Sequence, residues 1–366
     1  MKQLVLLLLM PFLIISCTEK EQPITKEEAI AVGKRLQGTV NDGHSQLFDS
    51  LFMNRVFVDR IAQAAQASLD KEYKKSLTNA LNKRTIGREM LKSMAADDTY
   101  EFLRHYEKDN QHHLIFRMYG SSGINYHDIE LVKINDRIGL ADMFVYMTGE
   151  NFSKTLARAM ELMSKETGER SDGTVLSAAK YVQKIRELMN RQEFGKALQL
   201  YEKLPPEFKK DKAMQLMHMS IVSELDQEQY RQALAAFEKQ YGQDPSSQLS
   251  LFDLYFMDED YDKALKVLDV LDASVQGDPM LNMYRSVLYT RMQQPEKSVQ
   301  CLEALYKAKP DFGDGVLELI ANYIETNNNE KAESLITAYQ ANKKFDQQKL
   351  ENLRYLYPDF AAFNEP

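Results

Sequence analysis

The chain has 366 residues, of which 44% are hydrophobic and 27% are charged, and its formal net charge is −8. This balance is typical of a folded chain with about two domains, and the acidic charge argues against a nucleic-acid partner, because phosphate backbones attract basic surfaces. The only two cysteines, Cys17 and Cys301, exclude a disulfide-rich fold.

A hydrophobic segment begins the chain and stops at a cysteine. Lys2 precedes apolar residues from Leu4 to Ile15, and polar residues follow Cys17 directly. The apolar run is too short to span a bilayer and has the proportions of a secretory signal. We therefore expect a signal peptide over residues 1–16 and a polar tether over residues 17–24.

The junction from Ile14 to Cys17 resembles the lipobox of bacterial lipoproteins. The resemblance implies cleavage before Cys17 and a diacylglycerol on its thiol, so that the chain is lipid-anchored to the bacterial envelope. Thr18 instead of Asp after the cysteine resembles an outer-membrane sorting signal, with either a periplasmic or a surface-facing orientation. The alternative is an ordinary cleaved signal with an incidental cysteine.

Residues from about Ile24 to Ala95 have the pattern of helices. Thr25 and Glu28 have the spacing of a capping box, in which each residue hydrogen-bonds the backbone of the other. Apolar residues recur at helical intervals over residues 47–65 and 73–91. These segments predict helices before the first strand.

Four runs with strand character follow, separated by the turn signals Asp-Asn, Ser-Ser-Gly and Asn-Asp. Such short links predict a four-stranded antiparallel sheet. Alternation places Leu114, Phe116 and Met118 on one face of their strand. It likewise predicts a shared face for Ile138, Leu140 and Phe144. A helix over residues 152–164 should end this α+β domain, which we expect over residues 25–165.

The order of helices and strands, with the segment FRMYGSSGINYHDIELVK, resembles the cystatin-like cone of the nuclear-transport-factor-like superfamily. The resemblance covers roughly residues 25 to 165 and implies a curved sheet around a cavity. An unrelated α+β domain with helices on one face of the sheet is the alternative.

Histidines in this half are candidates for chemistry. They are His44, His105, His112, His113 and His127, with Asp128 and Asp142 near them in sequence. A His-Asp couple can act as a general base. However, His112 and His113 must point to opposite faces of a strand, and no HExxH, CxxC, GxSxG or phosphate loop is present. The sequence therefore predicts no catalytic residue, no metal ligand and no cofactor.

The second half repeats a pattern in which a small residue recurs at a near-constant interval. The small residues are Ala197, Ala233, Ala264, Ser298 and Ala332, and neighbours in this series are separated by nearly equal stretches of chain. A residue that is large and apolar or aromatic follows four positions later in each case: Tyr201, Phe237, Leu268, Leu302 and Ile336. A close helix crossing at the small residue accounts for this pattern.

This period resembles that of the tetratricopeptide repeat, a helix-turn-helix unit of about 34 residues. The family's early Trp and its helix-helix Gly are both replaced, so the repeats are divergent. We expect a linker over residues 166–176, an all-α solenoid over residues 177–345 and a C-terminal helix over residues 346–366. This last helix carries Leu350, Leu353, Leu356 and Tyr357 at helical spacing and should cap the open end of the solenoid. A generic helical bundle is the alternative.

These patterns predict a non-enzymatic envelope lipoprotein that acts as a scaffold for a protein or peptide partner. The resemblance places the binding groove on the first helices of successive repeats. Counting from the small residues, the groove residues are His218, Asp253, Met283, Arg291, Leu317 and Glu325. The alternative is an envelope enzyme or small-ligand-binding protein with its site in the α+β domain.

Overall fold

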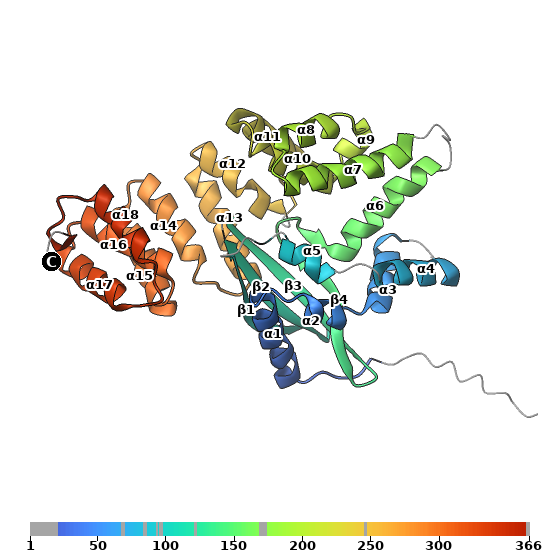
Figure 1. The fold of residues 1–366 in the computed structure, drawn as a ribbon, viewed down its shortest axis with the longest axis horizontal. Coiled ribbons are helices and arrows are strands. Elements are labelled where there is room, and N and C mark those ends of the chain that lie inside the picture. The colour runs from blue at the N-terminus through green and yellow to red at the C-terminus, as the bar shows by residue number, and fades with distance from the viewer. Residues whose placement is uncertain are drawn as a thin grey trace, which may run out of the picture.

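The computed structural model describes residues 21–66, 70–82, 86–92, 94, 98–120, 123–167, 174–244 and 247–363 (Figure 1). The predicted signal peptide and Cys17 lie outside these residues. An N-terminal group of helices covers one face of a sheet, and a long row of helices extends from α7 to α18. None of the described helices is long and apolar enough to cross a membrane.

The first helices pack their apolar residues against the sheet. Thr25 caps α1, because its hydroxyl accepts the Glu28 N–H at 3.2 Å and its own N–H donates to the Glu28 carboxylate at 2.8 Å. The predicted capping box is confirmed. Gly33 allows a close approach, since a Cβ there would lie 2.7 Å from the Phe102 ring. The N-terminal helices are α1 (Lys26–Asn41), α2 (Gln46–Leu51), α3 (Asn54–Ala64), α4 (Lys71–Asn82) and α5 (Ile86–Lys92).

The sheet is an antiparallel meander with strand order β1-β2-β3-β4-β5. Asp109, Asn110, Asn135 and Asp136 adopt positive φ at two of its turns, a conformation that Asn and Asp tolerate better than most residues. The four predicted strands are present, and a short fifth strand adds to the edge. The strands are β1 (Thr99–Lys108), β2 (Gln111–Gly120), β3 (Gly123–Ile134), β4 (Arg137–Val145) and β5 (Glu150–Asn151).

The two faces of the sheet belong to different cores. Leu114, Phe116 and Met118 lie together on the face that the N-terminal helices cover, as predicted. Ile138 and Leu140 also join that core. Phe144 does not, because an irregularity in the β3–β4 register shifts the alternation and places it opposite Asp128. The predicted shared face for Ile138, Leu140 and Phe144 is therefore wrong.

The helices after the sheet form consecutive pairs with short connections. The contacting pairs are α7 with α8, α10 with α11, α12 with α13, α14 with α15, and α16 with α17. Their bounds are α6 (Phe152–Thr167), α7 (Thr174–Asn190), α8 (Phe194–Tyr201), α9 (Pro206–Lys209), α10 (Lys212–Val222), α11 (Gln227–Tyr241), η2 (Leu249–Leu251), α12 (Phe252–Met257), α13 (Tyr261–Ser274), α14 (Leu281–Arg291), α15 (Pro295–Ala308), α16 (Gly313–Glu325), α17 (Asn329–Ala341), α18 (Gln347–Leu356) and η3 (Ala361–Phe363).

One turn geometry recurs inside four of these pairs. The residues with positive φ are Gln192, Glu259, Gln293 and Asn327, and the last three are one repeat period apart. The next N–H in each case donates to the carbonyl five residues earlier, at 2.8 to 2.9 Å, at Glu193, Asp260, Gln294 and Asn328. This bond is the mark of a Schellman motif. The pair α10–α11 lacks both the positive φ and this bond, so it is the divergent unit.

A second contact repeats at the same interval. The ammonium groups of Lys263, Lys297 and Lys331 lie 5.1, 5.3 and 5.2 Å from the ring centroids of Tyr255, Tyr289 and Tyr323, respectively. These are cation–π distances, and each contact ties the second helix of a pair to the first.

The predicted small residues lie at the helix crossings. Ala197, Ala264, Ser298 and Ala332 are fully buried, and the residue four positions later is buried in all five units. Ala233 in the divergent unit is only half-buried. The Ser298 hydroxyl donates to the Asn322 side chain at 2.6 Å, so its burial leaves no unpaired hydroxyl. The array therefore consists of tetratricopeptide-like helical repeats.

The last helix covers the end of the array, but not as completely as predicted. Leu350 and Leu353 are buried and α18 packs on α16. Leu356 is 73% exposed, so it does not take part in the cap. It is the last residue of α18, and the next residue, Tyr357, packs against the core instead.

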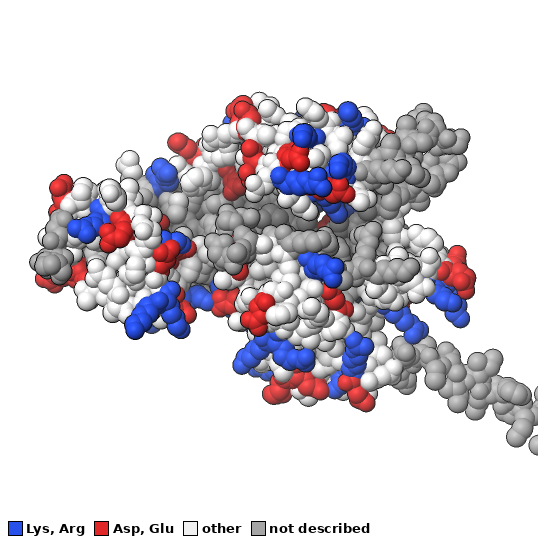
Figure 2. Space-filling model, viewed as in Figure 1, with Lys and Arg blue, Asp and Glu red and all other residues white. Residues whose placement is uncertain are grey.

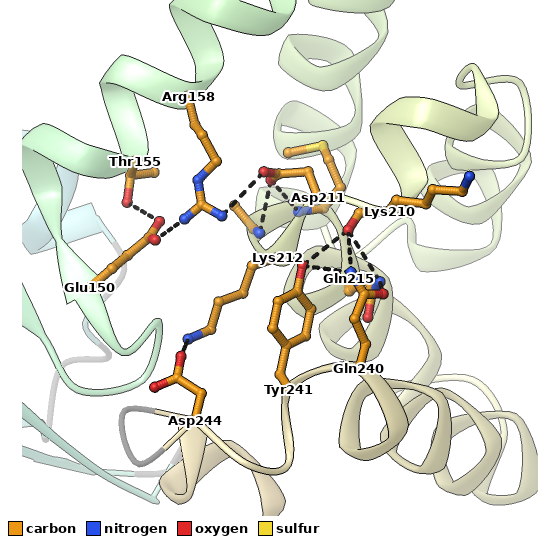
Figure 3. Close-up of polar contacts among 12 residues, drawn as sticks. Glu150, Thr155, Arg158, Lys210, Asp211, Lys212, Gln215, Gln240, Tyr241 and Asp244 are labelled. Carbon is orange, nitrogen blue, oxygen red and sulfur yellow. Dashed lines mark hydrogen bonds and ion pairs between the residues drawn. The ribbon is translucent and has the colours of Figure 1, made fainter. Parts of the chain in front are cut away.

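Polar contacts join α6 to the start of the array (Figure 3). Arg158 of α6 pairs with Glu150 of β5 and lies 3.6 Å from Asp211, the N-cap of α10. The Lys210 carbonyl accepts hydrogen bonds from Tyr241 at 3.0 Å and from Gln240 at 3.1 Å. This network fixes the first repeats relative to the end of the sheet.

Candidate partner-binding surface

The sheet face that the N-terminal helices leave uncovered packs against one edge of the array. Ile115, Ile124 and Tyr126 of this face share a core with helices α11 to α18. The Tyr119 ring meets the Phe312 ring edge-on at 5.5 Å, and the Tyr119 hydroxyl lies 3.9 Å from the Met283 sulfur. The covered edge is formed by the connections between repeats and the N-terminal ends of their first helices.

A buried ion pair lies at the centre of this contact. Arg117 of β2 pairs with Asp278, which precedes α14, and the side chains are 3% and 0% exposed. Tyr126 donates to the same carboxylate at 2.7 Å, and burial beside it raises the Tyr126 pKa well above its usual range. Glu101 also pairs with Arg117 and accepts from Lys309 at 2.6 Å. Charges from both halves of the chain are therefore matched in one network.

The docked sheet covers part of the predicted groove. Met283 is half-buried and touches Tyr119, and Leu317 is half-buried against the shared core. His218 stacks on the Tyr201 ring with centroids 4.7 Å apart, and burial lowers its pKa. These three groove residues thus contact other parts of the chain.

The other predicted groove residues are exposed. Asp253 accepts from the Tyr230 hydroxyl at 2.6 Å, and Glu325 accepts from the Tyr357 hydroxyl at 2.6 Å. Arg291 lies in the last turn of α14. Val287, one turn earlier on the same helix, is 38% exposed and was not among the predicted residues.

These exposed residues form two pairs, each at equivalent positions of successive repeats. Asp253 and Val287 are one repeat period apart, and so are Arg291 and Glu325. Equivalent positions of stacked repeats form rows along the array. Asp253 and Val287 belong to one such row and Arg291 and Glu325 to a second, and we call these four residues together the open groove. The open groove thus contains one apolar side chain and charged side chains of both signs.

The histidines of the sheet are divided between its faces. His112 and His113 point to opposite faces, as predicted, and His113 lies 2.9 Å from Asp128, which also accepts from Tyr106. His127 is buried 3.2 Å from the Tyr100 hydroxyl, and burial lowers its pKa to about 4. His127 is therefore uncharged at neutral pH and acts as a packing residue.

Asp142 has a structural role, because its carboxylate accepts two hydrogen bonds from Ser153. The Ser153 hydroxyl donates to Asp142 at 2.5 Å and the Ser153 N–H donates at 3.1 Å. Burial raises the Asp142 pKa, whereas these hydrogen bonds lower it. The residue anchors the start of α6 to β4.

No protein-family model and no curated protein matches the chain. Among solved structures, "MamA 41-end from Desulfovibrio magneticus RS-1" is similar over 44% of this chain and 92% of its own, at 15% identity and a TM-score of 0.38. "MamA AMB-1 C2221" is similar over 44% of this chain and 96% of its own, at 13% identity and a TM-score of 0.36. This degree of similarity is too low to establish the fold or the function of the chain. The repeats are therefore assigned from their turns and their buried small residues.

Proposed function

We propose that this protein is a non-enzymatic scaffold of the bacterial envelope that holds a partner protein in the open groove. The observation that supports the proposal is that exposed residues recur at two repeat positions, Asp253 with Val287 and Arg291 with Glu325. The first domain covers the N-terminal ends of the first helices and leaves Asp253, Val287, Arg291 and Glu325 accessible. An array that served only as a spacer would not need this division of the surface.

The partner that fits the open groove is an extended peptide segment with an apolar anchor and charges of both signs. Val287 offers an apolar contact, Arg291 a cation, and Asp253 and Glu325 two carboxylates. Glu318 lies near Glu325, and burial together with the carboxylates of Glu325 and Asp314 raises its pKa. On the face in Figure 2, positive and negative side chains alternate without a continuous basic stripe, which favours a protein over a nucleic acid.

The groove is tested by changing Val287→Ala together with Arg291→Gln. We expect recovery of the crosslinked partner from intact cells to fall by at least about tenfold, because truncating central interface residues costs roughly 1–2 kcal/mol each. The matched control is Val270→Ala with Lys266→Gln, an exposed pair with the same spacing on α13. Both variants should keep the thermal midpoint of the unchanged protein.

Quantitative mass spectrometry of the crosslinked proteins is the measurement. Equal recovery by the groove variant and the unchanged protein would show that the open groove is not the binding surface. Equal losses in the groove and control variants would show that the loss is not specific to the open groove.

The envelope location is part of the proposal and depends on Cys17. Cys17→Ser should abolish incorporation of a clickable fatty acid and release the protein from the outer-membrane fraction, because a serine hydroxyl does not accept the thioether-linked lipid. Cys301→Ser is the control, since Cys301 is a partly buried free thiol within α15 and should leave labelling unchanged. Undiminished labelling of the Cys17 variant would contradict the lipoprotein assignment.

A further inference from the structure

Three potential metal ligands meet at the end of the sheet, on the face that the N-terminal helices cover. His105 and Glu107 are two residues apart on β1 and therefore share a face. The strand register places His112 of β2 directly opposite Glu107. One donor atom from each of His105, Glu107 and His112 lies within 4.8 Å of the other two.

The distances suit a single ion. The His105 Nε2 and His112 Nδ1 atoms are 2.9 Å apart, and the Glu107 carboxylate is 3.8 Å from the same His112 nitrogen. Ligand bonds of about 2.0–2.1 Å at a tetrahedral zinc place two donor atoms roughly 3.3 Å apart. Both observed distances differ from this value by a few tenths of an ångström, which small side-chain rotations supply. An ion would also replace the proton that the two imidazoles now share.

The surroundings keep the ligands available. His105 and His112 are both half-buried between the strands. The Glu107 side chain is 59% exposed, whereas the His112 side chain is 14% exposed. The carboxylate thus faces the solvent from which an ion arrives, and the imidazoles are held by the strands. The positive charge of Lys26 is close enough to His105 to disfavour a bound cation. The Glu28 carboxylate is close enough to interact with His112.

We propose that His105, Glu107 and His112 form a Zn²⁺ site. Two imidazoles and one carboxylate are a donor set that zinc prefers, and three protein ligands leave a fourth position for water or a partner's side chain. The site lies on the opposite face of the sheet from the array, so it is independent of the open groove. It also departs from the expectation, drawn from the sequence, that these histidines bind no metal.

Titration of the detergent-solubilised full chain with ZnCl₂ by isothermal titration calorimetry tests the site after EDTA has been removed by dialysis. We expect binding of one ion per chain with micromolar or tighter affinity. Glu107→Gln should weaken the affinity by at least about tenfold, and His105→Gln with His112→Gln should abolish binding. His44→Gln, at an exposed histidine outside the cluster, should leave the affinity unchanged.

The Glu107 variant keeps the test decisive if the double histidine variant fails to fold, because Glu107 is exposed and its replacement is isosteric. Replacing zinc by Co²⁺ adds a spectroscopic measurement, since visible absorption bands report imidazole coordination. Absence of zinc binding, or equal affinities for the unchanged protein and the Glu107→Gln variant, would overturn the proposal.

Discussion

Replacing Ala264 by arginine should lower the free energy of unfolding by about 3–5 kcal/mol, because the change buries a charge without a partner. Ala264 is 0% exposed and lies in the first turn of α13, where that helix crosses α12. Leu254, Val267 and Leu268 belong to the same core. A guanidinium there must either lose its hydration or push the two helices apart.

Ala273→Arg is the control, because Ala273 lies on the same helix and is exposed. A cation near the C-terminus of a helix is neutral or slightly stabilising, so this variant should unfold like the unchanged protein. Urea denaturation of the full chain, followed by circular dichroism, is the measurement. Equal midpoints for the two arginine variants would contradict the assignment of Ala264 to a helix crossing.

The repeats could be predicted from the sequence because their determinants are local. The small residue, the large residue one turn later and the turn between the two helices all lie within single helix pairs, and four of the five small residues are fully buried. The capping box at Thr25 and the turns at Asp109–Asn110 and Asn135–Asp136 are local in the same sense. Short-range patterns of this kind survive in a divergent sequence.

The docking of the sheet on the array could not be predicted, because its determinants are far apart in sequence. Arg117 and Asp278 are separated by 161 residues, and neither has a neighbouring pattern that identifies its partner. Phe144 shows the same limit on a smaller scale, since one irregularity between β3 and β4 reverses the face of every later residue. The sequence therefore predicts groove residues along the repeats but not which of them the sheet covers.

The cluster of His105, Glu107 and His112 could be predicted only in part, because it depends on the register between two strands. Alternation along one strand was enough to separate His112 from His113, but the position of His105 and Glu107 beside His112 depends on the register between β1 and β2. A shift near Leu103 in that register changes which residues face each other. The sequence alone contains no signal for this irregularity, and so the three ligands could not be recognised as a group.

The buried ion pair between the two halves of the chain should be essential to their association. In Arg117→Met, the Asp278 carboxylate stays buried and loses its cation. Among the described residues, Tyr126 and the Met280 N–H still donate to it. Removing one partner of a buried pair costs about 3–5 kcal/mol. We expect this loss in urea denaturation, with a larger radius of gyration by small-angle X-ray scattering if the sheet leaves the array before it unfolds.

A second variant separates the loss of charge from the loss of shape. Adding Asp278→Asn to Arg117→Met removes the unpaired charge and keeps an oxygen that accepts from Tyr126, while Lys309 still pairs with Glu101. The double variant should therefore recover most of the lost free energy, since a buried ion pair can be replaced by neutral groups at little cost. A double variant as unstable as Arg117→Met would mean that the packing of the Arg117 side chain, and not its charge, holds the sheet on the array.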